Sequence, residues 1–195
     1  MRITADAKSA TRERILEAAS SLFRSNGWQA TTTRDIAAAA GIAAGTLFNY
    51  FQTKEAIAAA LVSEALTVKP EGAASLEEEL FTFIWSGLRS LRKLRGFLAA
   101  AAETIFSPLA RKSGESAGDS IRARQLETMQ RMAVVYGFAA PLSPVTVQLY
   151  WTLYLGVFSF WAADESPHQE DTLALLDQSL KLFVASLSIG SKGEK

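Results

Sequence analysis

Residues 27–54 constrain this chain most, because one short segment combines two helix starts, a glycine between them and an aromatic pair. Thr32 and Asp35 have the spacing of a capping box, in which hydroxyl and carboxylate satisfy each other's backbone donors at a helix N-terminus. A helix is therefore expected directly after Thr32, and Gly41 is suited to end it in a left-handed conformation. A second short helix is expected at residues 44–50. Two short helices around such a turn predict a helix-turn-helix.

The order of these residues resembles the DNA-binding domain of the TetR (tetracycline-repressor) family of bacterial regulators. That family's pattern runs roughly T-V-R-D-I-A-x-x-A-G-V-S-x-G-T-L-Y-x-Y-F-x-x-K-E. The resemblance covers about residues 11–65 and has no gap. The matching residues are Thr32, Arg34, Asp35, Ile36, Ala37, Ala40, Gly41, Gly45, Thr46, Leu47, Tyr50, Phe51, Lys54 and Glu55.

Three positions depart from the family pattern, and each departure removes a polar group. Ala43 replaces the usual Ser or Thr cap of the second helix, a loss of about 1 kcal/mol. Ala44 stands where many members carry a polar residue, and Phe48 replaces a Tyr that often reaches a phosphate. The remaining polar groups and the resemblance together predict the DNA-binding residues. These are Thr32, Thr33, Arg34, Gly45, Thr46, Asn49, Tyr50 and Lys54.

Other roles are open for several of these residues. Tyr50 has a packing alternative, and Phe51 beside it is expected in the core. Lys54 at the next helix start is expected to contact phosphate, with a solvated surface position as the alternative. Arg34 is equally suited to DNA and to an ion pair with Asp35 or Glu17.

Charge is distributed unevenly along the chain. The net charge is zero, yet residues 1–54 carry 7 Lys or Arg against 4 Asp or Glu, and the remainder carries 13 against 16. A mildly basic N-terminal part fits the electrostatic footprint of a DNA-binding protein. The sequence has no Cys and a single His, so neither a metal nor another cofactor is expected.

No targeting or membrane segment is expected. Residues 1–10 hold no apolar run of signal-peptide length. Residues 145–163 are the richest apolar stretch, and their length alone would allow a membrane span. They are interpreted as a buried amphipathic helix because they include Gln148 and several hydroxyl groups. These features predict a cytoplasmic protein without a membrane partner.

Apolar residues recur at helical spacing along the chain, without strand-like alternation or internal repeats. The prediction is an all-α fold of about nine helices. Because Lys-Pro-Glu-Gly at 69–72 breaks the pattern, residues 1–70 are expected to form the DNA-binding domain, with its motif at about 32–51. Residues 71–195 are expected to form a larger ligand-binding and dimerisation domain. Helices are expected at about 11–25, 33–40, 44–50, 54–68, 75–91, 97–109, 120–136, 144–163 and 169–189.

The last two helices are expected to form a homodimer. Apolar residues of the final helix repeat at 3, 4, 3, 4, the spacing of packed helices. Leu175, Leu182 and Val184 widen this surface, so a second subunit is expected to cover part of it. Gly156 would let two helices cross closely. The expected interface residues are Tyr154, Val157, Phe158, Trp161, Leu173, Leu176, Leu180, Phe183 and Leu187.

The C-terminal part is rich in large aromatic residues, which line many small-molecule pockets. Methionines adapt to irregular ligand shapes. The expected ligand is therefore small and largely apolar or aromatic. The residues expected to line the ligand pocket are Phe81, Trp85, Phe106, Met129 and Met132. For each of them, packing in the core is the alternative.

The resemblance implies a homodimeric repressor that binds a palindromic operator in double-stranded DNA and is released by a small-molecule effector. One alternative is a C-terminal domain that docks a protein partner and has no cavity. An enzyme is not expected, because His168, Asp164 and Glu165 make neither a triad nor a metal site without further groups. A cluster of titratable side chains in a cleft would favour an enzyme.

Overall fold

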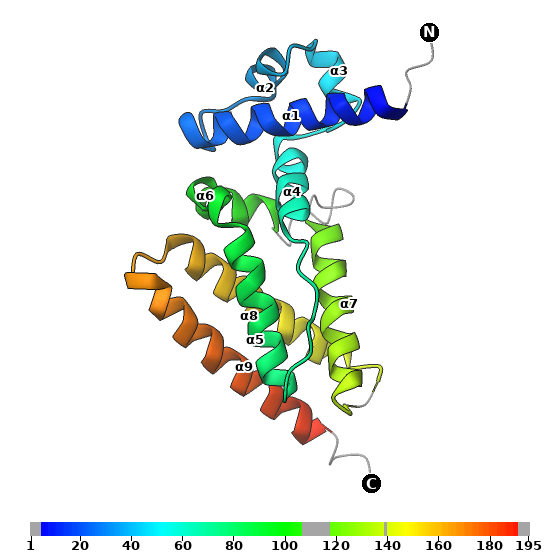
Figure 1. Cartoon of the computed structure of the whole chain (residues 1–195), viewed down its shortest axis with the longest axis vertical. Helices are drawn as coiled ribbons and strands as arrows, with labels where there is room; N and C mark the ends of the chain where they lie inside the picture. Colours follow the sequence, from blue (N-terminus) through cyan, green and yellow to red (C-terminus); the bar gives the residue numbers. More distant parts are fainter. Residues whose placement is uncertain (1–4, 107–117, 139, 191–195) are drawn as a thin grey trace. The chain divides into compact units, whose positions relative to one another are not determined.

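The computed structural model describes residues 5–106, 118–138 and 140–190, with side chains described up to Leu187 (Figure 1). Over these residues the prediction of an all-α fold with about nine helices is confirmed. In the described part of the chain, two 3₁₀ helices, Arg92–Leu94 and Pro167–Gln169, lie between α-helices. The α-helices are α1 (Ala5–Ser25), α2 (Thr33–Ala39), α3 (Ala44–Phe48), α4 (Lys54–Ala65), α5 (Leu76–Ser90), α6 (Arg95–Ile105), α7 (Asp119–Val135), α8 (Pro144–Ala163) and α9 (Glu170–Gly190).

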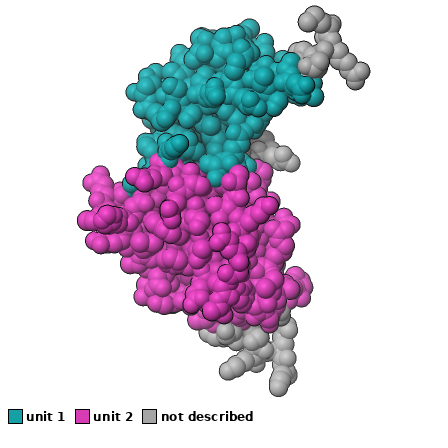
Figure 2. Space-filling model, viewed as in Figure 1, with its two compact units in different colours: residues 1–65, 93–119 teal, residues 66–92, 120–195 magenta. Residues whose placement is uncertain are grey.

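The chain divides into two compact units (Figure 2). The first unit comprises residues 1–65 and 93–119, and the second comprises residues 66–92 and 120–195. These units differ from the division expected at residue 70, because α6 packs with α1 and α4 in the first unit. The ring of Phe97 on α6 lies 4.8 Å from that of Phe23 on α1. The assignment of separate functions to residues 1–70 and 71–195 stays a prediction.

The first unit is built around the apolar face of α1. Ile15, Ala19 and Phe23 recur at intervals of four along this helix, and all three are buried. Trp28 follows the end of α1, and its ring lies 5.1 Å from that of Phe23. Helix α1 also contacts α2 and α4, and α2 contacts α3, so the two short helices of the predicted motif are joined to a long helix through α2. Their position is fixed by this packing, because helices of five and seven residues are not stable alone.

In the second unit, α9 packs against both α5 and α8 (Figure 1). Helix α8 begins at Pro144 as expected, where the hydroxyl of Ser143 accepts a hydrogen bond from the amide of Thr146. Tyr150 on α8 is buried, and its ring lies 5.4 Å from that of Phe183 on α9. Among the described helices, α8 included, none is both long enough and apolar enough to cross a membrane.

Asp164 organises the connection between α8 and α9. Its buried carboxylate accepts hydrogen bonds from the amides of Ser166 (2.8 Å) and Thr172 (3.0 Å), and from the Thr172 hydroxyl. Burial by itself raises the pKa of Asp164, but these hydrogen bonds outweigh it and hold the pKa well below its usual value. His168 is exposed beside this connection at φ 53°. Asp164 is thus a structural cap at the start of α9.

Candidate DNA-binding surface and ligand pocket

The capping box predicted at the start of α2 is present. The Thr32 hydroxyl accepts a hydrogen bond from the Asp35 amide at 3.2 Å, and the Asp35 carboxylate accepts from the Thr32 amide at 2.9 Å. The hydrogen bonds from the Thr32 side chain and backbone lower the pKa of Asp35. Asp35 therefore serves the helix start, while the neighbouring Thr33 is half-buried and Arg34 is exposed.

The turn between α2 and α3 has the geometry that its glycine predicts. Gly41 has a φ of +67°, a conformation that L-residues with a side chain rarely adopt. The amide of Ile42 donates to the carbonyl of Ala37 at 3.0 Å, which closes the C-terminus of α2. Ala43 then precedes α3 without any side-chain cap, as its methyl group requires.

Helix α3 is shorter than expected and presents a largely apolar outer face. It ends at Phe48 instead of reaching Tyr50, because the amide of Asn49 bonds to the Thr46 carbonyl and the chain tightens into a turn. Leu47 is fully buried and fixes the helix to the unit. Thr46 and Tyr50 are half-buried. The exposed residues of α3 and its C-cap are Ala44, Gly45, Phe48 and Asn49.

Phe48 is a candidate DNA contact, although the sequence alone indicated only the loss of a tyrosine hydroxyl at this position. Its side chain is 41% exposed, although phenylalanine is usually buried. The signal was present in the sequence, since Phe48 follows the buried Leu47 and therefore lies on a different side of the helix.

The structure places Lys54 differently from the expected phosphate contact. Its ammonium donates hydrogen bonds to the carbonyls of Trp28 (2.7 Å) and Thr31 (3.0 Å), and it lies 4.4 Å from the centroid of the Trp28 ring. Two of its three donors are therefore used within the first unit. Lys54 ties the turn after α1 to the start of α4. Nothing in residues 51–55 alone points to this, because both partners lie more than twenty residues earlier.

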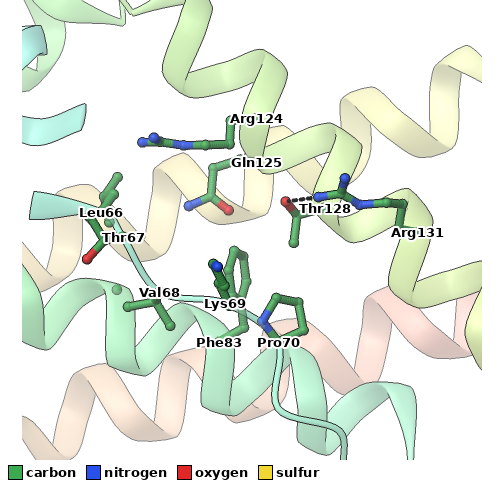
Figure 3. Close-up of a pocket in the computed structure, with 11 residues that line it drawn as sticks. Leu66, Thr67, Val68, Lys69, Pro70, Phe83, Arg124, Gln125, Thr128 and Arg131 are labelled. Carbon is green, nitrogen blue, oxygen red and sulfur yellow. Dashed lines mark hydrogen bonds between the residues drawn. The ribbon is translucent and has the colours of Figure 1, made fainter. Parts of the chain in front are cut away.

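A pocket of about 390 Å³ lies within the second unit (Figure 3). One wall is the segment Leu66–Pro70, which leads from α4 to α5, and another is α5 itself with Phe83 and Gly87. The third wall is α7, where Arg124, Gln125, Thr128 and Arg131 line the cavity. Its volume lies within the range of small-molecule sites, about 300–1,000 Å³.

None of the five predicted ligand-binding residues lines this pocket. Met129 and Met132 are buried, whereas Phe81 and Trp85 are half-buried on α5. Phe106 belongs to the first unit, where its ring packs closely against Gly118. The expected wall was wrong for this cavity because aromatic content does not distinguish a pocket wall from a packed core. The residues that do line it are mostly polar, basic or small.

The predicted dimer-interface residues are placed mainly in the core of a single chain. Eight of the nine are buried without any second subunit: Tyr154, Val157, Phe158, Trp161, Leu176, Leu180, Phe183 and Leu187. Leu173 is half-buried. The prediction placed these residues in a dimer interface because an apolar spacing of 3 and 4 indicates a packed helix face. That spacing does not indicate whether the same chain or a second subunit packs against the face. Among the side chains that the structure describes, the exposed large apolar residues of α8 and α9 are Val145, Leu149, Phe160, Leu175 and Leu182.

A helical chain with this α2–α3 geometry is a helix-turn-helix protein. The family model for bacterial regulatory proteins of the tetR family matches residues 15–61. The HTH-type transcriptional repressor KstR2 of Rhodococcus jostii is 48% identical over 50 residues. That alignment covers 26% of this chain and 24% of KstR2, so it spans about a quarter of that relative. Residues 15–61 therefore carry a DNA-binding domain of the tetR family type.

Solved structures are similar over most of the chain. A TetR transcriptional regulator from Rhodococcus sp. RHA1 has a TM-score of 0.68 with 20% identity, covering 93% of this chain and 98% of that one. The structure of Thermus thermophilus FadR, a TetR-family transcriptional repressor in complex with lauroyl-CoA, has a TM-score of 0.62 with 25% identity. It covers 89% of this chain and 93% of FadR. These similarities include both compact units.

Proposed function

We propose that this chain is a homodimeric transcriptional repressor that binds operator DNA and is released by a small molecule. The observation that carries the proposal is the α2–α3 helix-turn-helix, in which Leu47 anchors α3 while its other face is exposed. An exposed helix of this kind fits the major groove of B-DNA, which is about 12 Å wide. KstR2 and FadR, which are similar to this chain, are themselves described as transcriptional repressors.

The residues on this surface have distinct proposed roles. Asn49 is exposed at the end of α3 and can form two hydrogen bonds with an adenine. Ala44 and Phe48 offer apolar contacts of the kind that recognise the methyl group of thymine. Arg34, exposed in the first turn of α2, suits a phosphate contact. Gly45 has open space where a Cβ would lie, which allows the DNA backbone to approach.

The test is selection of bound sequences by the purified chain from a random pool of double-stranded DNA. A palindromic site with half-sites about 34–36 Å apart is expected from a dimer with one recognition helix per subunit. Asn49→Ala should relax the preference at one position in each half-site. Asn26→Ala, which changes an exposed asparagine at the end of α1, is the matched control and should leave the selected sequence unchanged. A chain that enriches no sequence would refute the proposal.

The dimer is proposed to form through the outward faces of α8 and α9. Leu149, Gly156 and Phe160 are exposed on α8, and Leu175 and Leu182 are exposed on α9. Their spacings of seven, four and seven residues put them on one face of each helix. Gly156 has open space around it, so it permits a close helix crossing. These residues replace the buried stripe as the proposed interface.

The pocket in the second unit supports a small-molecule effector over a C-terminal part that only docks proteins. Its wall Leu66–Pro70 directly follows α4 in the chain, so a bound ligand contacts the segment that connects the pocket to the DNA-binding unit. Release from DNA requires that the ligand bind two conformations of the chain with different affinities. FadR, whose structure is similar to this chain, was solved in complex with lauroyl-CoA, which supports a ligand-binding role for a chain of this fold.

A further inference from the structure

The α7 wall of the pocket is polar and the opposite wall is mainly apolar. Arg124, Gln125, Thr128 and Arg131 occupy positions i, i+1, i+4 and i+7 and therefore share one face of α7. Figure 3 shows them across the cavity from the segment Leu66–Pro70 and Phe83. A ligand between these walls meets hydrogen-bonding groups on one side and apolar surface on the other.

Gln125 provides a buried acceptor without a partner. Its side chain is 4% exposed, and Nε2 donates to the Tyr154 hydroxyl at 3.2 Å. Burial raises the pKa of Tyr154, so this phenol keeps its proton at neutral pH. Oε1 of Gln125 has no hydrogen-bond partner. Because buried acceptors are nearly always satisfied, this oxygen marks a place for an N–H or O–H group of a ligand.

The charge of the lining residues is of one sign. Among the eleven, Lys69, Arg124 and Arg131 are cationic and none is a carboxylate. Arg131 uses two donors, one to Glu127 at 3.1 Å and one to the Thr128 hydroxyl at 3.2 Å, out of the five that a guanidinium carries.

Lys69 is shared with a smaller neighbouring hollow, which also contains Glu79. The carboxylate of Glu79 accepts a hydrogen bond from the amide of Gly72 at 3.0 Å. Glu79 lines the hollow beside Lys69, whereas Glu127, which pairs with Arg131, lines neither cavity. The clearest position for an anion is therefore the α7 wall, between Arg124 and Arg131.

We propose that the effector is an amphipathic anion. Its apolar part lies against Leu66, Val68 and Phe83, and its carboxylate, sulfonate or phosphate group binds Arg124 and Arg131. An N–H or O–H group of the same molecule donates to Oε1 of Gln125. This inference rests on the proposed effector role of the pocket and adds the chemical class of the ligand, which differs from the largely apolar molecule expected from the sequence.

The test uses two fluorescent probes that differ in charge. 1-Anilinonaphthalene-8-sulfonate has two aromatic parts, an N–H group and a sulfonate, and N-phenyl-1-naphthylamine is the same molecule without the sulfonate. Both are titrated into the full chain without DNA. The sulfonate probe should bind more tightly. Arg124→Gln combined with Arg131→Gln should weaken it about ten-fold and leave the neutral probe unchanged.

Two further variants complete the design. Arg89→Gln removes an exposed arginine at the end of α5 that does not line the pocket, and it should change neither affinity. Gln125→Leu should weaken both probes by the same factor, because both carry the N–H group. Circular dichroism confirms the folding of each variant. The arginine pair is exposed, so its test stands even where Gln125→Leu fails to fold.

Equal affinity of the wild-type chain for the two probes would show that the effector is not an anion. The same conclusion would follow if the arginine double variant lost no more affinity for the sulfonate probe than Arg89→Gln does. Unchanged binding to folded Gln125→Leu would overturn the donor contact. Selected DNA is titrated with the same preparations. If the chain binds its selected DNA but shows no preference between the probes, only this inference is refuted. If the chain prefers the sulfonate probe but does not bind DNA, the proposed repressor role is refuted.

Discussion

Replacing Lys54 with Met separates a structural role from a phosphate contact at one position. The substitution keeps an unbranched side chain that can still cover the Trp28 ring, but it removes the ammonium. The variant therefore loses the hydrogen bonds to the Trp28 and Thr31 carbonyls and the cation–π contact at 4.4 Å. Both carbonyls then need water, although Thr31 is 1% exposed and Trp28 is 4% exposed.

The magnitude follows from these contacts. A hydrogen bond from a charged donor contributes about 1.5–3 kcal/mol, and the cation–π contact contributes about 0.5–1 kcal/mol where solvent reaches it. Lys54 is half-buried, so water replaces part of what is lost. We expect a net destabilisation of about 2 kcal/mol. For a chain of this size, each kcal/mol lowers the Tm by about 2–4 °C, which predicts a decrease of roughly 4–8 °C.

The assay is thermal unfolding together with DNA affinity over a range of salt concentrations. Lys54→Met should lower the Tm and leave the dependence of DNA affinity on salt unchanged. Arg34→Gln is the control, because Arg34 is exposed on the same unit. It should leave the Tm unchanged and reduce the salt slope by roughly one phosphate contact. An unchanged Tm in Lys54→Met with a salt slope reduced by about one would show that the structural argument is wrong.

Three further outcomes are expected. Hydrogen bonds lower the pKa of Asp164 even though burial opposes them, so its ionised form stabilises the fold at neutral pH. Asp164→Asn should therefore lower the Tm at pH 7, and the difference in Tm between the variant and the wild type should shrink as the pH falls below about 4. A difference in Tm that stays constant with pH would contradict the lowered pKa of Asp164. Phe48→Ala should leave the Tm nearly unchanged, because the ring is 41% exposed, and weaken DNA binding about ten-fold in a mobility-shift assay; equal affinity would exclude the thymine contact. Leu182→Glu, at a site 69% exposed, should give a folded monomer by light scattering, whereas Leu180→Glu, 3% exposed, should unfold the chain; a dimeric Leu182→Glu would count against the proposed interface.

The sequence by itself determined the features that depend on neighbouring residues. Thr32 and Asp35 form their capping box at a separation of three residues, and Gly41 has the positive φ that its place after α2 predicts. Pro144 begins α8 for the same reason, since its ring fixes a helical φ and the lost amide has no partner there. A contact within one helical turn has the same partner in every fold that contains the helix. Such signals can therefore be read without knowing the rest of the structure.

Only the tertiary structure decided which residues meet across long separations. The periodicity of α9 predicted one packed face, but not that Leu180 lies in the core of its own chain while Leu182 is exposed. The sequence predicted Lys54 at a helix start, yet its role depends on hydrogen bonds to carbonyls 26 and 23 residues earlier. Likewise, the pocket needs the loop 66–70, α5 and α7 together, so no single segment carries its pattern. Burial and side-chain partners depend on how helices pack, and that arrangement is a property of the whole unit rather than of any one stretch of sequence.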